Sequence, residues 1–104
     1  MILLCYGTRP EWIKIKPLIG EFKKNNYPYK ILFTGQQEHI GQFEYDIKVG
    51  IENGANRLDS IVASLMNFSY PKDITHILVQ GDTTSAIALA LSAFHNGIKV
   101  IHLE

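Results

Sequence analysis

The chain has 104 residues, of which 46% are hydrophobic, and its ten Lys and Arg balance ten Asp and Glu. This length allows one small domain with a modest core, and the neutral balance argues against nucleic acid or an anionic membrane as a partner. Neither a signal peptide nor a membrane-spanning segment is expected, because the first apolar run is short and lacks a basic leader.

The first predicted element is a strand over residues 2–6. Its residues are apolar without polar alternation, which is typical of a strand covered on both faces in a parallel α/β sheet. The only cysteine, Cys5, lies in this run. We therefore expect a buried, inert thiol, no internal disulfide and a reducing, cytoplasmic setting.

The turn Gly7-Thr8-Arg9-Pro10-Glu11 follows this strand. Gly7 allows a sharp turn, Thr8 is a residue type that caps free helix amides, and Pro10 suits a first helical turn. The amino end of a helix attracts anions, and Arg9 adds a charge with a phosphate-matching fork. The turn is therefore a candidate phosphate site, although it is neither a Gly-x-Gly-x-x-Gly fingerprint nor a Walker A loop. An ordinary turn with a solvated arginine is the alternative.

The first helix is predicted over residues 10–25. Pro17 lies inside it and removes one backbone hydrogen bond, so we expect it to kink the helix or to confine it near its first turns. An apolar stripe at helical spacing forms the core side, and lysines form a solvated face. The stripe is Ile15, Leu18, Ile19 and Phe22, and the lysines are Lys16, Lys23 and Lys24.

The middle of the chain has a weaker pattern. A second strand is predicted over 29–34, a short helix around 37–44, an edge-like strand over 46–49 and a loop over 52–56. A clearer helix begins near residue 57 and ends before Tyr70-Pro71. Its apolar stripe is Leu58, Ile61, Val62, Leu65 and Met66.

The last third predicts a strand over 76–80, a turn from Gly81 to Ser85, an alanine-rich helix to residue 95 and a strand over 98–103. Small residues of this helix should allow close approach to a sheet, and large ones should supply core volume. The small residues are Ala86, Ala90 and Ala93, and the large ones are Ile87, Leu89, Leu91 and Phe94.

Alternating strands and helices predict a doubly wound, parallel α/β sheet, in which ligands bind beyond the carboxyl ends of the strands. Four polar segments follow those ends, and we expect a cation, an amide and two carboxylates to converge there. Such a group suits removal or replacement of a phosphorylated leaving group. The segments are Gly7-Thr8-Arg9, Thr34-Gly35-Gln36, Gly81-Asp82-Thr83 and His102-Leu103-Glu104.

In order and spacing, these segments, together with Ile13-Lys14-x-x-Pro17-Leu18, resemble the non-hydrolysing UDP-N-acetylglucosamine 2-epimerases. The resemblance spans the chain and implies residues 1–104 of a longer protein. They would form an incomplete amino-terminal Rossmann-like domain of a glycosyltransferase-B type fold, with the second domain absent. The fragment alone is not expected to be catalytic, because further family residues lie beyond Glu104.

The resemblance implies interconversion of UDP-N-acetylglucosamine and UDP-N-acetylmannosamine for envelope polysaccharide synthesis. UDP is eliminated to a 2-acetamidoglucal and is then added back. The family's acid/base carboxylates match Asp82 and Glu104, and its substrate-binding cations match Arg9 and Lys14. The remaining substrate-binding candidates are Gly7, Thr8, Gln36 and Thr83. No cofactor is implied, no metal is expected, and the resemblance implies a homodimer.

Two departures from the family pattern stand out. The segment Gln37-Glu38-His39-Ile40 replaces the Gln-His-x-x-Met of many bacterial members, so their allosteric site is not expected here. Trp12 stands where a small residue is common, and we expect it to pack near the cleft. His39, His76 and His95 are expected at the surface or in turns, and together with His102 they lack metal-ligand spacing.

Several alternatives remain open. Lys14 fits a solvated helix face, Asp82 fits a simple helix cap, and Glu104 fits a charged chain end. The whole chain also fits a non-catalytic, flavodoxin-like nucleotide or phosphate binding module. Within the enzymes, a hydrolysing epimerase or an epimerase acting on a related UDP-diacetamido sugar acid are the rivals.

Overall fold

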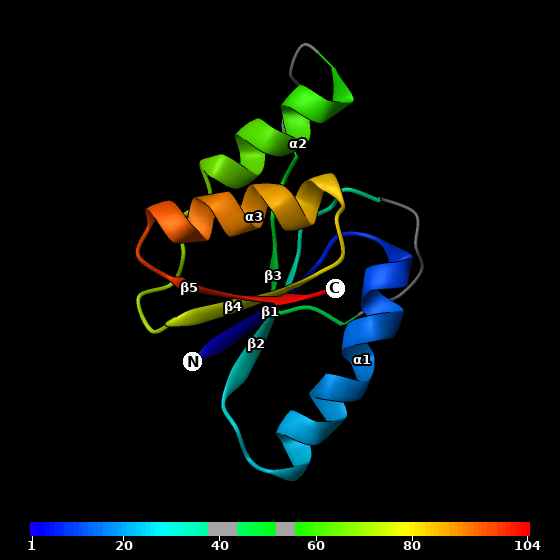
Figure 1. Ribbon diagram of the computed structural model, residues 1–104, viewed down its shortest axis with the longest axis vertical. Coiled ribbons are helices and arrows are strands. Elements are labelled where there is room, and N and C mark those ends of the chain that lie inside the picture. Colours follow the sequence, from blue (N-terminus) through cyan, green and yellow to red (C-terminus); the bar gives the residue numbers. More distant parts are fainter. Residues whose placement is uncertain (38–43, 52–55) are drawn as a thin grey trace.

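The computed structural model describes residues 1–37, 44–51 and 56–104 (Figure 1). All strand pairs are parallel, in the order β3-β2-β1-β4-β5. This is the doubly wound α/β fold that the sequence predicts. The elements are β1 (Ile2–Tyr6), α1 (Arg9–Lys24), β2 (Tyr29–Phe33), β3 (Ile47–Lys48), α2 (Arg57–Met66), β4 (His76–Gln80), α3 (Thr84–His95) and β5 (Lys99–Leu103).

Helices cover both faces of the sheet, with α1 on one side and α2 and α3 on the other (Figure 1). The central strand β1 alternates between them. Leu4 and Tyr6 pack with the α1 side, whereas Leu3 and Cys5 pack with the α2 and α3 side. Four of the five β1 residues are buried, which confirms the prediction of a strand covered on both faces.

Helix α1 continues through Pro17 to Lys24, so of the two effects predicted for Pro17, a kink or confinement of the helix near its first turns, the second is wrong. Pro17 is exposed, and the carbonyl that loses its helical donor is that of Ile13, whose side chain is also exposed. The buried residues Ile15 and Ile19 lie on either side of it and hold the helix against the sheet. Water can therefore solvate the break while packing maintains the helix.

Helix α3 departs from the predicted packing. Ala86, Ala93 and Leu89 are buried against the sheet, as expected. The other three large residues predicted to fill the core do not, since Ile87, Leu91 and Phe94 are 55%, 50% and 73% exposed. Spacing of four and three residues places those three on one outward stripe.

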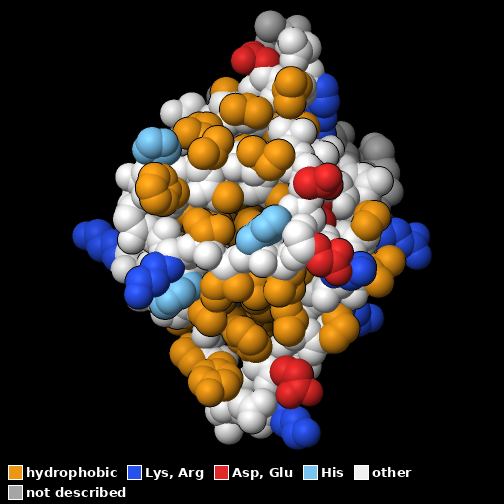
Figure 2. Space-filling view, viewed as in Figure 1, with side chains coloured by type: hydrophobic (Ala, Val, Ile, Leu, Met, Phe, Trp, Pro, Cys, Tyr) orange, Lys and Arg blue, Asp and Glu red, His pale blue; other side chains and the backbone are white. Residues whose placement is uncertain are grey.

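Helix α2 packs beside α3 and shows the same effect. Ile61 and Leu65 are buried, but Leu58, Val62 and Met66 are exposed. Figure 2 shows hydrophobic side chains gathered over these two helices on the viewed face. The apolar spacing thus predicted the helix correctly, but only part of its apolar face is buried.

The predicted edge-like strand is confirmed as β3, at the end of the sheet beside β2. The predicted helix around 37–44 and the loop over 52–56 lie almost wholly outside the described residues. Within the described ranges, none of the helices combines the length and the apolar character needed to cross a bilayer.

Candidate functional site

The site lies where the strand order reverses. The chain runs from β1 outward through β2 to β3 and then crosses to β4 on the other side of β1. Beyond the carboxyl ends of β1 and β4 lies a cavity of about 550 Å³, which is the position at which doubly wound sheets bind ligands. We call it the switch-point cavity. It is lined by Thr8, Pro10, Glu11, Gln37, Gln80, Gly81, Asp82, Thr83 and Glu104.

Both predicted carboxylates, Asp82 and Glu104, line the switch-point cavity. The cation beside them is Lys14, whose Nζ lies 3.5 Å from Oε1 of Glu104. Their side chains are 55% and 69% exposed, so solvent screens this pair and it adds little to stability. The arrangement leaves an ammonium group and two carboxylates accessible to a ligand.

Two members of the group predicted to converge, Arg9 and Gln36, are not among the residues that line the switch-point cavity. Arg9 does not line the switch-point cavity, but a separate cavity of about 620 Å³ with Trp12, Ile13, Lys16 and Pro17. Trp12 is only 6% exposed, and its ring packs against Tyr6 with centroids 4.8 Å apart. Its edge therefore borders the cavity that holds Arg9, and its bulk belongs to the core.

Gln36 is the second absent member, and its neighbour Gln37 supplies the cavity's amide. The side-chain oxygen of Gln36 accepts the N–H of Ser85 at 3.0 Å, which caps the start of α3. The side-chain oxygen of Gln37 accepts the N–H of Arg9 at 2.8 Å, which caps the start of α1. Two consecutive glutamines after β2 thus close the amino ends of two different helices.

Gly7 is required for a reason other than the predicted sharp turn. Its φ is not among the positive values, but a Cβ at this position would collide with Oγ1 of Thr34 and Oγ of Ser85. Those two hydroxyls are 2.8 Å apart and hydrogen-bonded to each other. Gly7 is therefore buried beneath the cavity as a spacer between β2 and α3.

Thr8 does not cap α1 with its side chain, in contrast to the prediction. Its hydroxyl instead donates a hydrogen bond to Oε2 of Glu11. The other carboxylate oxygen of Glu11, Oε1, accepts a hydrogen bond from the hydroxyl of Thr83 at 3.2 Å. Two N–H groups are missing for an external anion at the amino end of α1, because Pro10 has none and that of Arg9 donates to Gln37. The carboxylate of Glu11 also lies at this helix end, where an external anion would otherwise bind.

Glu11 lines the switch-point cavity and is a candidate functional residue that the sequence-based prediction did not include. It is 2% exposed, and burial raises its pKa above the ordinary value of 4.5, against the opposing effect of its hydrogen bonds. The spacing Thr8-x-x-Glu11 is that of a capping box, in which a glutamate reaches back to the N-cap amide. That signal was available from the sequence.

The turn Gly81-Asp82-Thr83 joins β4 to α3. Gly81 has a φ of +76°, a conformation that favours glycine, and the ring Nε2 of His102 donates to its carbonyl at 2.6 Å. The cap of α3 is Thr83, whose hydroxyl accepts the N–H of Ala86 at 3.2 Å. Asp82 is therefore not the helix cap. Among the described residues, no side chain or backbone group engages its exposed carboxylate, which lines the switch-point cavity.

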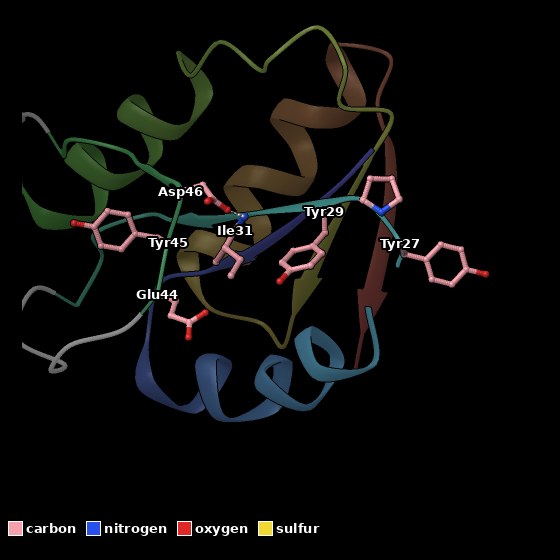
Figure 3. A pocket seen from close by; sticks show the side chains of 7 residues that line it. Tyr27, Tyr29, Ile31, Glu44, Tyr45 and Asp46 are labelled. Carbon is pink, nitrogen blue, oxygen red and sulfur yellow. Dashed lines mark hydrogen bonds between the residues drawn. The ribbon is translucent and has the colours of Figure 1, made fainter. Parts of the chain in front are cut away.

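A third cavity, of about 400 Å³, lies away from these residues (Figure 3). Tyr29 and Glu44 extend into it from opposite sides, whereas Tyr27 points outward. Asp46 accepts the N–H of Ile31 at 2.8 Å and so holds the edge of the sheet. None of the predicted site residues lines this cavity.

The cysteine and the metal-ligand residue types were also compared with the predictions. Cys5 is buried, and burial raises the pKa of its thiol, which confirms the expected inert cysteine. Residues 1–37, 44–51 and 56–104 contain no cluster of three or more His, Cys, Asp or Glu that is arranged to hold a metal.

Several known proteins are similar to this chain in sequence and in fold. No known family profile matches the chain. It is 37% identical to a UDP-N-acetylglucosamine 2-epimerase of Salmonella borreze and 33% identical to one of Campylobacter jejuni, in each case over 99% of this chain and 30% of the relative. The chain thus spans about a third of the length of these relatives.

Solved structures give the same result. The chain superposes with a TM-score of 0.82 on a UDP-GlcNAc 2-epimerase from Neisseria meningitidis bound to UDP-GlcNAc, with 29% identity over 99% of this chain and 32% of that one. A second structure, from Listeria monocytogenes and described as a putative UDP-N-acetylglucosamine 2-epimerase, gives a TM-score of 0.82 at 28% identity.

Proposed function

The chain is a relative of the UDP-N-acetylglucosamine 2-epimerases along almost its whole length, and from this premise we propose that the full-length protein interconverts UDP-N-acetylglucosamine and UDP-N-acetylmannosamine. The observation that supports this most strongly is the switch-point cavity. Asp82 and Glu104 line it together, with the ammonium of Lys14 beside Glu104. Two accessible carboxylates and a cation are the groups that proton transfer next to a departing diphosphate requires.

The proposed reaction balances as an elimination followed by an addition. A base removes the proton from C2 of the sugar while the bond between C1 and the diphosphate oxygen breaks, which yields UDP and 2-acetamidoglucal. UDP then adds back to C1, and an acid returns a proton to C2 from the opposite face. Asp82 and Glu104 are the proposed acid and base. The proposed cations for the departing diphosphate are Lys14, which lies beside Glu104, and Arg9, whose chain neighbours Thr8 and Pro10 line the switch-point cavity.

The chain spans 30% of the Salmonella borreze protein, so the activity is proposed for the longer polypeptide. We propose that residues 1–104 supply part of one Rossmann-like domain in a two-domain enzyme of the glycosyltransferase-B type. The same proposal includes a homodimer, a cytoplasmic location and a role in envelope polysaccharide synthesis. The buried, unpaired thiol of Cys5 is compatible with a reducing compartment.

The experiment is incubation of the full-length protein with UDP-N-acetylglucosamine, with both UDP-sugars and free UDP followed by NMR. Wild type should equilibrate the two sugars, and Asp82→Asn should lower kcat by about 100-fold or more, because general acid–base catalysis contributes at that scale. Asp73→Asn is the matched control, since Asp73 is an exposed aspartate that precedes β4 and lies outside the switch-point cavity. It should retain wild-type kcat.

Other outcomes identify the rivals. Free N-acetylmannosamine with UDP indicates a hydrolysing epimerase, and turnover of a different UDP-sugar indicates a related epimerase. Binding of the UDP-sugar without any turnover supports the non-catalytic nucleotide-binding module. An Asp82→Asn variant as active as wild type contradicts the catalytic role of Asp82.

A further inference from the structure

Glu11 is a carboxylate in the protein interior, where a charged group is unfavourable. Within residues 1–37, 44–51 and 56–104 it is the only charged side chain that is buried, at 2% exposure. Burial of a carboxylate costs free energy unless hydrogen-bond donors replace its lost water. Packing alone therefore does not explain why this buried position carries a carboxylate.

The donors to Glu11 come from two elements that are distant in sequence. Thr8 donates to Oε2 from the start of α1, and Thr83 donates to Oε1 at 3.2 Å from the start of α3. Residues 11 and 83 are 72 positions apart, so this contact joins the two helix starts that border the switch-point cavity. Both oxygens of the carboxylate are used.

Thr83 is held from both sides by this arrangement. Its hydroxyl accepts the N–H of Ala86 at 3.2 Å and donates its own proton to Glu11. A hydroxyl with one donor and one acceptor satisfied has a defined rotamer. Glu11 therefore determines how Thr83 sits at the head of α3.

Asp82 directly precedes Thr83 and has no anchor of its own. Across the described ranges, neither a hydrogen bond nor an ion pair fixes its exposed carboxylate. Its direction follows from the turn, which His102 holds at the carbonyl of Gly81 and Glu11 holds at Thr83. A change at Thr83 should therefore move Asp82.

We propose that Glu11 is a positioning residue for the reaction: through Thr83 it fixes the turn that carries Asp82 and so sets where the Asp82 carboxylate meets the sugar. This inference rests on the proposed function. Glu11 lines the switch-point cavity, but its two oxygens are engaged by protein donors rather than available to substrate. Its effect on the reaction is therefore indirect.

The kinetic test compares E11Q, T83V and the double variant in the full-length protein. Each single variant should lower kcat by about tenfold with KM changed by less than about twofold, and the double variant should be no slower than the worse single, because both remove the same link. T83S keeps the hydroxyl and should recover most of what T83V loses. The control E21Q alters an exposed glutamate of α1 and should leave kcat unchanged.

A second readout does not need catalysis. Backbone amide resonances of Gly81 and Asp82 should shift clearly in E11Q and T83V, shift much less in T83S and stay in place in E21Q. If wild type fails to epimerise, the proposed function fails, and these shifts still decide whether Glu11 fixes the turn. If E11Q does not fold, the comparison of T83V with T83S still provides both the kinetic and the NMR result. Unshifted amides in E11Q, additive kinetic losses, or wild-type kcat in E11Q would each overturn the proposal.

Discussion

Two helix starts border the switch-point cavity, and they are closed in different ways. Both α1 and α3 follow neighbouring parallel strands, begin after a glycine and have a threonine N-cap. At α3 the N-cap hydroxyl of Thr83 accepts a helix N–H, as N-caps ordinarily do. At α1 the N-cap hydroxyl of Thr8 donates to Glu11 instead. The N-cap threonine of α3 therefore binds a helix N–H, whereas the N-cap threonine of α1 binds a buried carboxylate.

This difference decides which groups remain for a ligand. At α1 the anion position is taken by Glu11, so the negative charge there belongs to the protein. At α3 the carboxylate of Asp82 stays exposed beside the cap. The two turns look equivalent in sequence as strand, glycine and helix, but only the second presents a free side chain to the cavity.

The largest expected effect comes from the glycines that precede the two helices. Gly7→Ala places a Cβ against Thr34 and Ser85, and overpacking of this kind costs about 1–3 kcal/mol or more. Gly81→Ala meets no neighbour and pays only for its φ of +76°, about 1–2 kcal/mol. Urea denaturation measures both free energies of unfolding.

The matched control is Gly20→Ala in the exposed middle of α1, where a Cβ meets nothing. It should raise the free energy of unfolding by about 0.5–1 kcal/mol, because alanine is the better helix former. A Gly7→Ala variant as stable as wild type would show that β2 and α3 do not meet as closely as described.

A smaller effect separates the two glutamines that cap these helices. Gln36→Ala leaves the N–H of Ser85, a residue only 1% exposed, without its acceptor, which costs about 1–3 kcal/mol. Gln37→Ala frees the N–H of Arg9 at an exposed position, where water replaces the lost oxygen, so the cost should stay below about 0.5 kcal/mol. Thermal and urea unfolding measure the difference. Equal losses would mean that the two caps are equally buried.

The finest difference between the helix starts is their response to pH. The folded Glu11 carboxyl binds its proton more tightly than the unfolded one, because burial raises its pKa above 4.5. Its contribution to the free energy of unfolding is therefore fully present below that value and is lost as the pH rises through the folded pKa. Relative to wild type, E11Q should gain stability as the pH rises.

Paired urea titrations of wild type and E11Q, between about pH 4 and about pH 8, measure that trend. E21Q provides the reference for an exposed glutamate of the same helix. A stability difference between wild type and E11Q that stays constant with pH would contradict the raised pKa.

Much of this architecture follows from the sequence. The strands β1 and β4 coincide with the predicted ranges, since continuous apolar runs between turn residues have one good solution in a parallel sheet. The position of Asp82 and Glu104 at one sheet edge follows from the same topology. Local pattern and sheet geometry agree at these places.

The failures share a physical cause, because each depends on contacts between distant segments. Ile87, Leu91 and Phe94 have the spacing of core residues when the helix is considered alone. Which side of α3 is buried depends instead on its contacts with other elements, α2 among them. Gly7 is required by side chains of β2 and α3 that periodicity does not register. The link from Glu11 to Thr83 spans 72 positions, and only half of it, the capping-box spacing, is visible locally.

The most direct test of the central claim, that carboxylates of the switch-point cavity move a proton at the sugar, is epimerisation in D₂O. The full-length protein is incubated with UDP-N-acetylglucosamine, and deuterium at C2 of both UDP-sugars is measured by NMR. The account predicts deuterium at C2 of the UDP-N-acetylmannosamine formed, with incorporation nearly abolished in Asp82→Asn and intact in Asp73→Asn. UDP-N-acetylmannosamine that retains protium at C2, or rapid incorporation in Asp82→Asn, would contradict it.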